Sequence, residues 1–463
     1  MSIHSDGDDQ RSFGAENFDL SMLGETPTGR SLVFFREDAD ASETSIASVL
    51  SNKAGLNSLP SSEDLDASDE EGQVAEAPEL ILSNLGIAVV DADEDQAGHL
   101  AAAVNEPDND IELVIPEMTD QLFGCGCEGE GAGSSAMELA KELESSGVER
   151  LCEMLKLVSN LVCKDEATLE TALSAGMASS CFTDSRTATW GLQATGVVDS
   201  KFSGRGTRVA VIDTGIDRRH PDFDPRQRRI VARSFSGVPV QDQNGHGTHC
   251  IGTACGPENS RVSSRRYGVA HNSEIFALKV FNNASRPTAR RGDVIRAMDF
   301  ANRNGCKILS LSLGAATNGA VVPEYARAIS RLRRAGSLVI AAAGNSGRLG
   351  FQTGAPANSP DAMAIAALDA CLRKANFSNT GKIELAAPGV NVLSSLPMPN
   401  GLGRLNGTSM ATPHVAGIAA LWLEANPGMT PDQLERKLQQ SARDVRLAPS
   451  VAGSGFVQAP VGC

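Results

Sequence analysis

Hydrophobic residues follow two different patterns along this chain, and the change comes near residue 187. Between residues 30 and 117, short apolar runs alternate with segments of helical spacing. In chain order they predict a strand at Ser31–Phe35, a helix at Ala41–Leu56, two strands or one bent strand at Leu80–Val90, a helix at Asp95–Asn105 and a strand at Ile111–Ile115 that Pro116 ends. The order strand, helix, strand, strand, helix, strand is typical of a small α+β domain of ferredoxin-like topology.

From about Thr187 onward, apolar runs alternate with amphipathic segments. The runs predict strands at Arg208–Ile212, Glu274–Val280, Lys307–Leu313, Leu338–Ala343, Ala362–Ala367 and Ile383–Ala386. The amphipathic segments predict helices at Asp293–Asn304, Pro323–Ala335 and Thr430–Ala442. Near-continuous apolar strands that alternate with helices indicate an α/β fold, a largely parallel sheet flanked by helices.

A glycine-rich stretch and two expected helices separate the two regions. Residues 124–133 read GCGCEGEGAG, and helical spacing follows at Ser134–Asn160 and Glu166–Gly176. We therefore divide the chain into four parts. They are a disordered lead (1–29), a ferredoxin-like domain (30–123), a linker with a helical segment (124–186) and a parallel-sheet domain (187–463).

The charge is divided as unevenly as the hydrophobic pattern. The whole chain carries a net charge of −16, yet residues 1–185 hold 8 basic and 39 acidic side chains, whereas residues 186–463 hold 33 basic and 18 acidic ones. The two parts therefore have net charges of −31 and +15. One hypothesis for the basic part is salt-sensitive binding of nucleic acid. Its basic residues are scattered, however, and no aromatic-rich basic motif accompanies them. We therefore expect no nucleic-acid partner.

Composition narrows the remaining classes. Hydrophobic residues make up 41% of the chain, which is enough for a core. No apolar run reaches about 18 residues, so we expect no membrane span. The start, MSIHSDGDDQ, has no basic segment followed by an apolar stretch. We therefore expect no secretory signal, and either a cytoplasmic location or export by a non-standard route.

The ten cysteines do not form a dense disulfide scaffold. Cys125 and Cys127 are the nearest pair, and no second pair at zinc-ligand spacing follows them. We therefore expect no metal site there. Free thiols are the default expectation, with one or two disulfides left open.

Three polar motifs lie at predicted strand ends or helix starts: VIDTGID with Asp213, NGHGTHC with His246, and GTSMATPH with Ser409. Each alone has an ordinary structural explanation as a turn or helix cap, and a metal site through His246 and His249 lacks a third ligand. Together they supply the nucleophile, the base and the carboxylate that activate a serine hydroxyl. Asn345, in AAAGNSG after a predicted buried strand, can donate its amide to a developing oxyanion.

With four motifs in this order, residues 187–460 resemble the catalytic domain of subtilisin-like serine proteases. The resemblance implies an endopeptidase that hydrolyses peptide bonds in protein or peptide substrates through an acyl-enzyme. It assigns the attack to Ser409, the proton transfers to His246, the orienting carboxylate to Asp213, and oxyanion binding to Asn345 with the Ser409 N–H. The alternative is a catalytically silent binding or scaffold protein on the same fold, but such decay should delete some of these residues and none is missing.

The resemblance also implies substrate-binding segments. One wall of the cleft would be the strand Ser312, Leu313 and Gly314, which pairs with an extended substrate, and the wall of the first specificity pocket would be Ala342, Ala343 and Gly344. The opposite rim falls near Ala289–Val294, where Arg290 and Arg291 lead to the hypothesis of a preference for acidic residues upstream of the cleaved bond. Solvated surface charge is the alternative explanation for these arginines.

No cofactor is required by a protease of this kind. The loop Gly256–Ala270 lacks the asparagine-rich calcium loop of typical bacterial subtilisins, so we expect no strong calcium site. Cys250 in HGTHC is similar to the proteinase K branch, where a buried thiol lies near the base. A weak structural calcium site of that branch would use carbonyls near Pro360 and the carboxylate of Glu384.

The N-terminal domain resembles the inhibitor-type prodomain of this family, by its order of elements and by the segment LGIAVVDAD, Leu85–Asp93. An unrelated α+β domain is the alternative. The resemblance implies that the prodomain acts in cis, with its tail near Pro116–Phe123 in the active site, in a protein we expect to be a monomer. Cleavage after that tail, near Thr183–Thr187, or at both places is left open.

Overall fold

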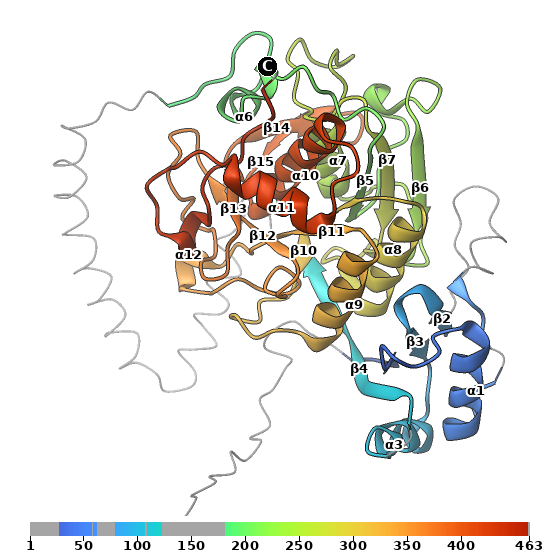
Figure 1. Cartoon of the computed structure of the whole chain (residues 1–463). Coiled ribbons are helices and arrows are strands. Elements are labelled where there is room, and N and C mark those ends of the chain that lie inside the picture. The colour runs from blue at the N-terminus through green and yellow to red at the C-terminus, as the bar shows by residue number, and fades with distance from the viewer. Residues whose placement is uncertain (1–26, 58, 63–78, 107–108, 123–180, 462–463) are drawn as a thin grey trace, which may run out of the picture.

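The computed structural model describes residues 27–57, 59–62, 79–106, 109–122 and 181–461 (Figure 1). The expected glycine-rich linker, the helices expected at Ser134–Asn160 and Glu166–Gly176, and the cysteines before residue 181 lie outside the described residues. The described residues form an N-terminal unit, 27–122, and a larger unit, 181–461. No helix in these ranges is long and apolar enough to cross a membrane.

The N-terminal unit is an antiparallel sheet with strand order β4-β1-β3-β2. Its elements are β1 (Pro27–Phe35), α1 (Glu43–Ala54), β2 (Leu80–Leu82), a 3₁₀ turn (Ser83–Leu85), β3 (Ile87–Val90), α3 (Glu94–Ala103) and β4 (Ile111–Leu122). The side chain of Ser42 caps α1, and Asp93 forms a capping box with Gln96 at the start of α3. Element order and sheet order are those of the ferredoxin-like topology expected from the sequence.

Both faces of this small sheet are covered, because side chains alternate along each strand. On β1, Val33 and Phe35 pack into the core formed with α1 and α3. Leu32 and Phe34 point the other way, into a core shared with two helices of the larger unit. The N-terminal unit therefore docks through an apolar sheet face.

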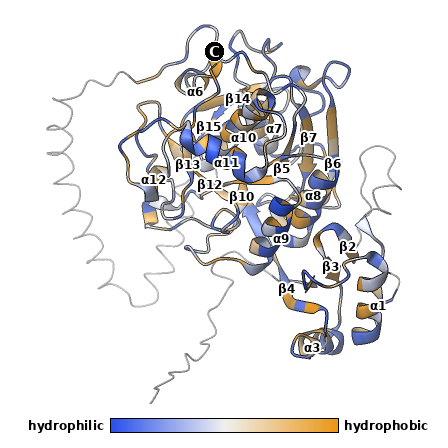
Figure 2. Ribbon diagram, in the orientation of Figure 1, coloured by the Kyte–Doolittle hydropathy of each residue, from blue (hydrophilic) through white to orange (hydrophobic). Residues whose placement is uncertain are grey.

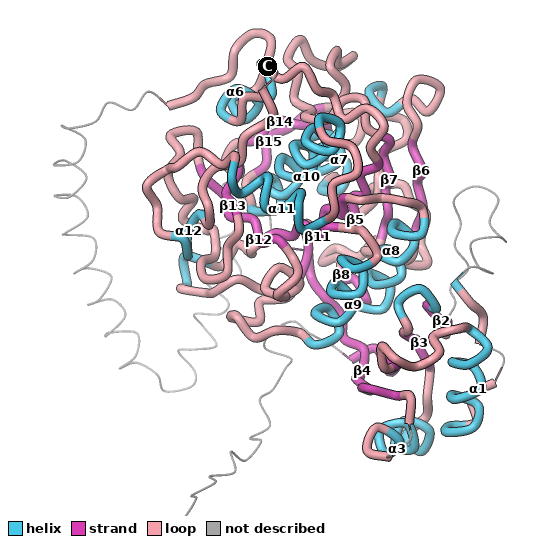
Figure 3. Tube along the Cα trace, in the orientation of Figure 1, coloured by secondary structure: helices cyan, strands magenta, loops and turns pink. Residues whose placement is uncertain are grey.

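Two boundaries differ from the sequence expectation. β1 begins at Pro27, inside the segment 1–29 that was expected to be a disordered lead. β4 does not end at Pro116 but continues to Leu122. The reason is non-local: beyond Pro116 the strand pairs with β8 (Thr288–Arg290) and β10 (Leu313–Gly314), which come from distant parts of the chain. Figures 1 and 3 show β4 running out of the small sheet into the larger unit.

The larger unit is built on a seven-stranded parallel sheet in the order β13-β12-β11-β9-β5-β7-β6. Its strands are β5 (Arg208–Asp213), β6 (Ile230–Ser234), β7 (Glu274–Lys279), β9 (Ile308–Leu311), β11 (Leu338–Ala342), β12 (Met363–Leu368) and β13 (Leu385–Pro388). Strand β6 was not expected from the sequence. The antiparallel pair β14 (Val392–Ser395) and β15 (Leu402–Leu405) lies apart from this sheet.

Helices cover both faces of the parallel sheet. On β5, Val209 and Val211 face the core with α7 (His246–Cys255) and α10 (Thr408–Ala425). Ala210 and Ile212 face the core with α8 (Arg291–Arg303) and α9 (Pro323–Arg334). Shorter or outer helices are α6 (Trp190–Ala194), α11 (Pro431–Gln440) and α12 (Pro449–Ala452), and 3₁₀ turns lie at Val197–Asp199, Pro221–Phe223 and Gly347–Leu349. In Figure 2 strand β7 of the parallel sheet is largely hydrophobic, whereas the outer helix α11 is largely hydrophilic.

One disulfide joins the start of the larger unit to its body. Cys181 and Cys371 are bonded, 190 residues apart in the sequence. Among the described cysteines, Cys250, Cys255 and Cys306 are free and buried. The default expectation of free thiols is therefore wrong for Cys181 and Cys371.

Candidate active site

Asp213 ends the central strand β5, and its side chain is fully buried. Its Oδ1 accepts hydrogen bonds from the Thr214 N–H (2.7 Å) and from Nδ1 of His246 (2.7 Å). The following turn requires glycine, because a Cβ on Gly215, whose φ is +109°, would lie 2.1 Å from the Val240 carbonyl oxygen. The carboxylate is thus fixed at the carboxyl end of the sheet, where open α/β folds place their sites.

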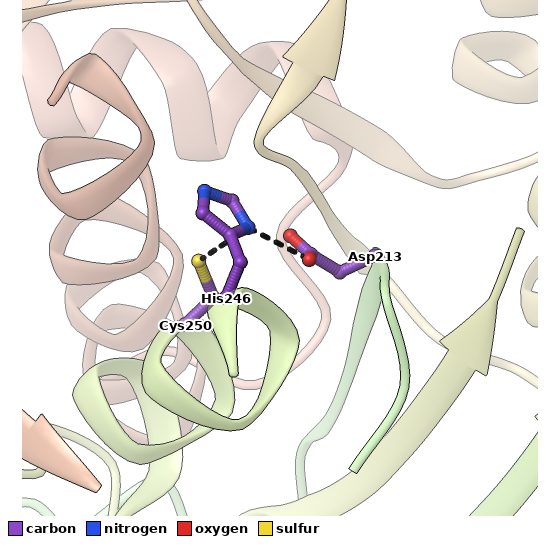
Figure 4. A group of neighbouring side chains, drawn as sticks. All are labelled: Asp213, His246 and Cys250. Carbon is purple, nitrogen blue, oxygen red and sulfur yellow. Dashed lines mark hydrogen bonds and ion pairs between the residues drawn. The ribbon is translucent and has the colours of Figure 1, made fainter. Parts of the chain in front are cut away.

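His246 is the first residue of α7, and its buried ring is oriented by Asp213 (Figure 4). A carboxylate on Nδ1 fixes the tautomer in which Nε2 can accept a proton. The helix start approaches β5 closely, because Gly247 has no side chain and a Cβ there would lie 2.4 Å from the Gly215 carbonyl oxygen. The contact between the two motifs therefore depends on glycine at both positions.

Asp242 holds this helix start in place and was not singled out from the sequence. Its Oδ1 accepts from the N–H groups of Asn244 (3.0 Å) and Gly245 (2.9 Å) and from the Thr214 hydroxyl (3.0 Å), and its Oδ2 accepts from the Thr248 N–H (2.9 Å) and hydroxyl (2.6 Å). The signal in the sequence is an aspartate two residues before Asn-Gly-His, a pattern typical of a side-chain-capped turn.

Ser409 lies in the first turn of α10, where backbone N–H groups have no helical partner and the helix dipole favours negative charge. Its hydroxyl donates to the Ser312 carbonyl oxygen at 3.4 Å, and the Ser312 hydroxyl donates to the Ser409 carbonyl oxygen at 2.9 Å. The Oδ1 of Asn345 accepts from the Thr408 N–H (2.9 Å) and hydroxyl (2.8 Å). In this orientation the oxygen of the Asn345 side chain is used as an acceptor, and its amide nitrogen is the end that can donate.

Cys250 lies one helical turn after His246. Its sulfur is 3.8 Å from His246 Nδ1 (Figure 4). It is also 3.4 Å from the Ser409 carbonyl oxygen. Burial raises the pKa of the Cys250 thiol to about 11, so it stays protonated and is a poor nucleophile at neutral pH. Donor atoms of Asp213, His246 and Cys250 lie within 4.8 Å of one another, but a protonated thiol suits a metal poorly.

The other histidine of the motif points away from the site. His249 Nε2 is 2.9 Å from the Val392 carbonyl oxygen, and burial lowers the pKa of His249 to about 3. It is therefore a neutral packing residue, and the structure does not bring it toward His246 as a metal ligand.

The expected substrate strand is occupied by the chain itself. Leu313 and Gly314 pair antiparallel with Leu122 and Gln121 at the end of β4. On the other side, β8 pairs with Thr119, Asp120 and Gln121 of the same strand. Gln121 and Leu122 also line a pocket with His246. An extended segment from the N-terminal unit thus lies between the two rim strands and beside the histidine.

The wall expected from Ala342, Ala343 and Gly344 begins at the last residue of β11. Both alanines are fully buried, and the Gly344 N–H donates to the Thr408 hydroxyl at 3.1 Å, beside Ser409. Their role in a first specificity pocket stays a prediction.

The two rim arginines differ in their surroundings. Arg290 is partly exposed and forms an ion pair with Asp293 at 2.6 Å. Arg291 is 4% exposed, and its guanidinium lies 2.9 Å from Asp120 and 2.7 Å from Glu324. Arg291 is therefore not a solvated surface charge, so the alternative explanation does not apply to it.

The carbonyls and carboxylate expected to hold a weak calcium ion surround a lysine instead. The Lys382 ammonium donates to the carbonyl oxygens of Ala357 (3.1 Å) and Ala362 (2.6 Å) and to Oε2 of Glu384 (2.8 Å). Because one cation already uses these oxygens, Ca²⁺ does not fit together with Lys382. The calcium site proposed near Pro360 and Glu384 is not compatible with this arrangement.

The loop Gly256–Ala270 is held by a carboxylate rather than by an asparagine-rich segment. Asp222 accepts from the Ser260 hydroxyl (2.6 Å), the Arg261 N–H (2.6 Å) and the Tyr267 hydroxyl (2.5 Å). Direct hydrogen bonds therefore anchor this loop.

Comparison with known proteins places the larger unit in a family. The model of the subtilase family, Peptidase S8, matches residues 204–456. The chain belongs to the subtilase family. "Thermostable alkaline protease" of Halalkalibacterium halodurans is 39% identical over 285 residues, 60% of this chain and 74% of the relative. "Subtilisin Savinase" of Lederbergia lenta is 37% identical over 275 residues, 58% of this chain and 96% of the relative.

A solved structure agrees with these sequences. "Sphericase" has a TM-score of 0.51 and 31% identity, and the match covers 58% of this chain and 98% of that one. The larger unit has the subtilisin-like fold, and this subtilase is a serine endopeptidase. The family model matches residues within the larger unit, so it does not test the role of the N-terminal unit.

Proposed function

We propose that this subtilase is made as a zymogen and that Asp213, His246, Ser409 and Asn345 carry its reaction. Ser409 attacks the peptide carbonyl while His246 takes its proton, and His246 then protonates the leaving amine. Asp213 keeps the imidazole in the required tautomer and stabilises the imidazolium. The Asn345 amide and the Ser409 N–H bind the oxyanion, and water hydrolyses the resulting acyl-enzyme.

The observation that supports the zymogen proposal is the position of β4. A strand of the N-terminal unit that lies between β8 and β10 fills the place of an extended substrate. A bound segment of this kind excludes other peptides from the rim strands. The N-terminal unit is therefore proposed to inhibit the enzyme in cis.

Electrostatic complementarity supports the same role. Glu112 forms ion pairs with Arg327 (2.8 Å) and Arg331 (3.4 Å) of α9, and Glu37 forms one with Arg334. Acidic side chains of the N-terminal unit thus face basic ones of the larger unit, as expected from the net charges of −31 and +15.

The catalytic assignment is tested by labelling the purified protein with a serine-directed phosphonate and by measuring casein hydrolysis. Ser409→Ala should abolish both signals, while Ser450→Ala, at an exposed serine, should leave both intact. Absence of labelling in the wild type would indicate a silent protease fold instead.

The zymogen assignment needs a separate readout. Intact-mass spectrometry should find the Ser409→Ala protein at full length and the wild type cleaved between residues 122 and 188. A fully active wild type that keeps all 463 residues would refute the zymogen proposal.

A further inference from the structure

Asp120 of β4 is completely buried against the larger unit. Its Oδ1 accepts from Nε of Arg291 at 2.9 Å, and the Tyr325 hydroxyl donates to its Oδ2. The Arg291 guanidinium lies over the Tyr325 ring, 5.9 Å from its centroid, and also binds Glu324 at 2.7 Å. These side chains form a pocket that holds a carboxylate by charge and by a hydroxyl donor.

The backbone holds Asp120 as a substrate residue would be held. Asp120 pairs with Ala289 of β8, and the next two residues, Gln121 and Leu122, pair with Gly314 and Leu313 of β10. A peptide in the same register places the side chain two residues before the one opposite Leu313 into the same pocket. The contacts of Asp120 therefore describe a subsite of the cleft as well as an anchor of the N-terminal unit.

The larger unit alone has an excess of one positive charge among the paired residues in and near this pocket. Arg291 pairs with Glu324, and Arg290 and Arg296 both pair with Asp293, so these three arginines face two acids. Asp120, Arg30 and Glu117 come from the N-terminal unit, and the last two neutralise each other at 2.6 Å. One additional carboxylate from a bound peptide restores the balance.

We infer that Arg291 and Tyr325 form an acid-selective subsite that favours aspartate two residues before the substrate residue facing Leu313. This inference rests on the proposed function, since it names a substrate preference of the same cleft. Aspartate suits the pocket better than glutamate, because the short side chain of Asp120 already reaches both donors. Arg291 and Tyr325 are thus specificity-determining residues.

The test measures kcat/KM on quenched peptides with the sequence of residues 117–124, in which position 120 is Asp, Glu, Asn, Ala or Lys. The enzyme is obtained by expressing the full chain, and its active sites are titrated with the phosphonate. We expect the Asp peptide to be cleaved about tenfold faster than the Asn peptide, the effect of one charge-assisted contact in a partly solvated cleft. The Lys peptide should be the poorest.

Variants then assign the preference to the pocket. Arg291→Met should bring the Asp-to-Asn ratio close to one while keeping cleavage of the Ala peptide, and Tyr325→Phe should lower the ratio several-fold by removing only a hydroxyl. Arg348→Met removes the same charge at an exposed position and should leave the ratio unchanged. If Arg291→Met fails to fold, the Asp-to-Asn ratios of the wild type and of Tyr325→Phe still test the inference.

The outcomes separate this inference from the proposed function. In one outcome the wild type is labelled and active but cleaves the Asp peptide with a kcat/KM less than about twice that of the Asn peptide. That result overturns the acid-selective subsite but not the catalytic assignment. Absence of labelling and of peptide cleavage overturns both. A high ratio that Arg291→Met does not change shows that another part of the cleft selects the acid, and this also overturns the inference.

Discussion

Replacing Lys382 with alanine should destabilise the larger unit, because it removes the contacts of one half-buried ammonium group. The ammonium makes three hydrogen bonds, to Ala357, Ala362 and Glu384, and the lysine side chain is 27% exposed. Hydrogen bonds to charged groups contribute about 1.5–3 kcal/mol each, but partial exposure and regained side-chain entropy offset much of this. We expect a loss of about 2–3 kcal/mol, or about 5 °C in Tm for a domain of this size.

The effect of calcium on the Tm is a more specific test of this substitution than the loss of stability alone. In Lys382→Ala, two carbonyl oxygens and the Glu384 carboxylate are left without their cation, and these are the ligand types that Ca²⁺ prefers. Calcium at about 100 times its Kd would restore about 2.7 kcal/mol. Calcium should therefore raise the Tm of the variant more than that of the parent protein.

The assay is thermal unfolding followed by circular dichroism, with EDTA or with CaCl₂, in a Ser409→Ala background that prevents self-digestion. Lys307→Ala, at an exposed lysine, is the matched control and should change the free energy of unfolding by less than about 0.5 kcal/mol. A Lys382→Ala protein within 1 °C of its parent, or a parent that gains as much from calcium as the variant, would refute the reasoning.

Three further measurements follow from the site and the interface. Asn345→Ala should lower kcat about 100- to 1000-fold with little change in KM, a magnitude known from a related subtilisin rather than worked from this structure. Arg331→Ala, which removes contacts to the carbonyl oxygen of Gly86 and to Glu112, should weaken inhibition by the N-terminal unit at least tenfold, less so in 1 M salt. The free energy of unfolding of the Ser409→Ala chain, measured in urea, should fall as the pH drops from about 6.5 toward about 4. The reason is that burial lowers the pKa values of His249, His271 and His414 to between about 3 and about 4.

Each of these three predictions has a result that would contradict it. A large rise in KM without loss of kcat would remove Asn345 from the oxyanion site. Equal inhibition at low and high salt would assign docking to the apolar face alone. In the pH experiment the histidines bind protons in the unfolded chain at a pH at which they stay neutral in the folded chain. Each of the fully buried His249 and His414 therefore lowers the free energy of unfolding by up to about 1.4 kcal/mol per pH unit, and the less buried His271 lowers it by less. A stability that is flat between pH 7 and pH 5 would contradict this.

Much of the parallel-sheet unit was predictable, because its strands are buried on both faces and appear as apolar runs. The runs expected at Arg208–Ile212 and Glu274–Val280 correspond to β5 and β7. Strand β6 was missed because it lies at the sheet edge and three of its five residues are only half-buried. Its pattern of burial is weak, and edge strands carry less hydrophobic signal.

The candidate site was predictable from motifs, but its supports were not. Asp213 and His246 are hydrogen-bonded as the motif order suggested. Asp242 binds N–H groups of its own turn, two to six residues further on, and only the turn pattern around it marks that role. Lys382 binds carbonyl oxygens that lie 20 and 25 residues before it in the sequence, and no periodicity marks such contacts. The end of β4 was missed for the same reason, since its partner strands lie more than 160 residues away in the sequence.

A single strand connects the two properties proposed for this chain. β4 pairs with β1 inside the N-terminal unit and with β8 and β10 inside the cleft, so inhibition and substrate binding use one continuous backbone ladder. Because a ladder accepts many sequences, the ladder alone selects neither the inhibitory tail nor a substrate. Selection must come from side chains. Glu117 and Asp120 of the tail are both fully buried, and Asp120 is the one of these two that forms an ion pair with Arg291 of the larger unit. The pocket around Arg291 therefore gives the tail its register and, by the same contacts, gives a substrate its preference.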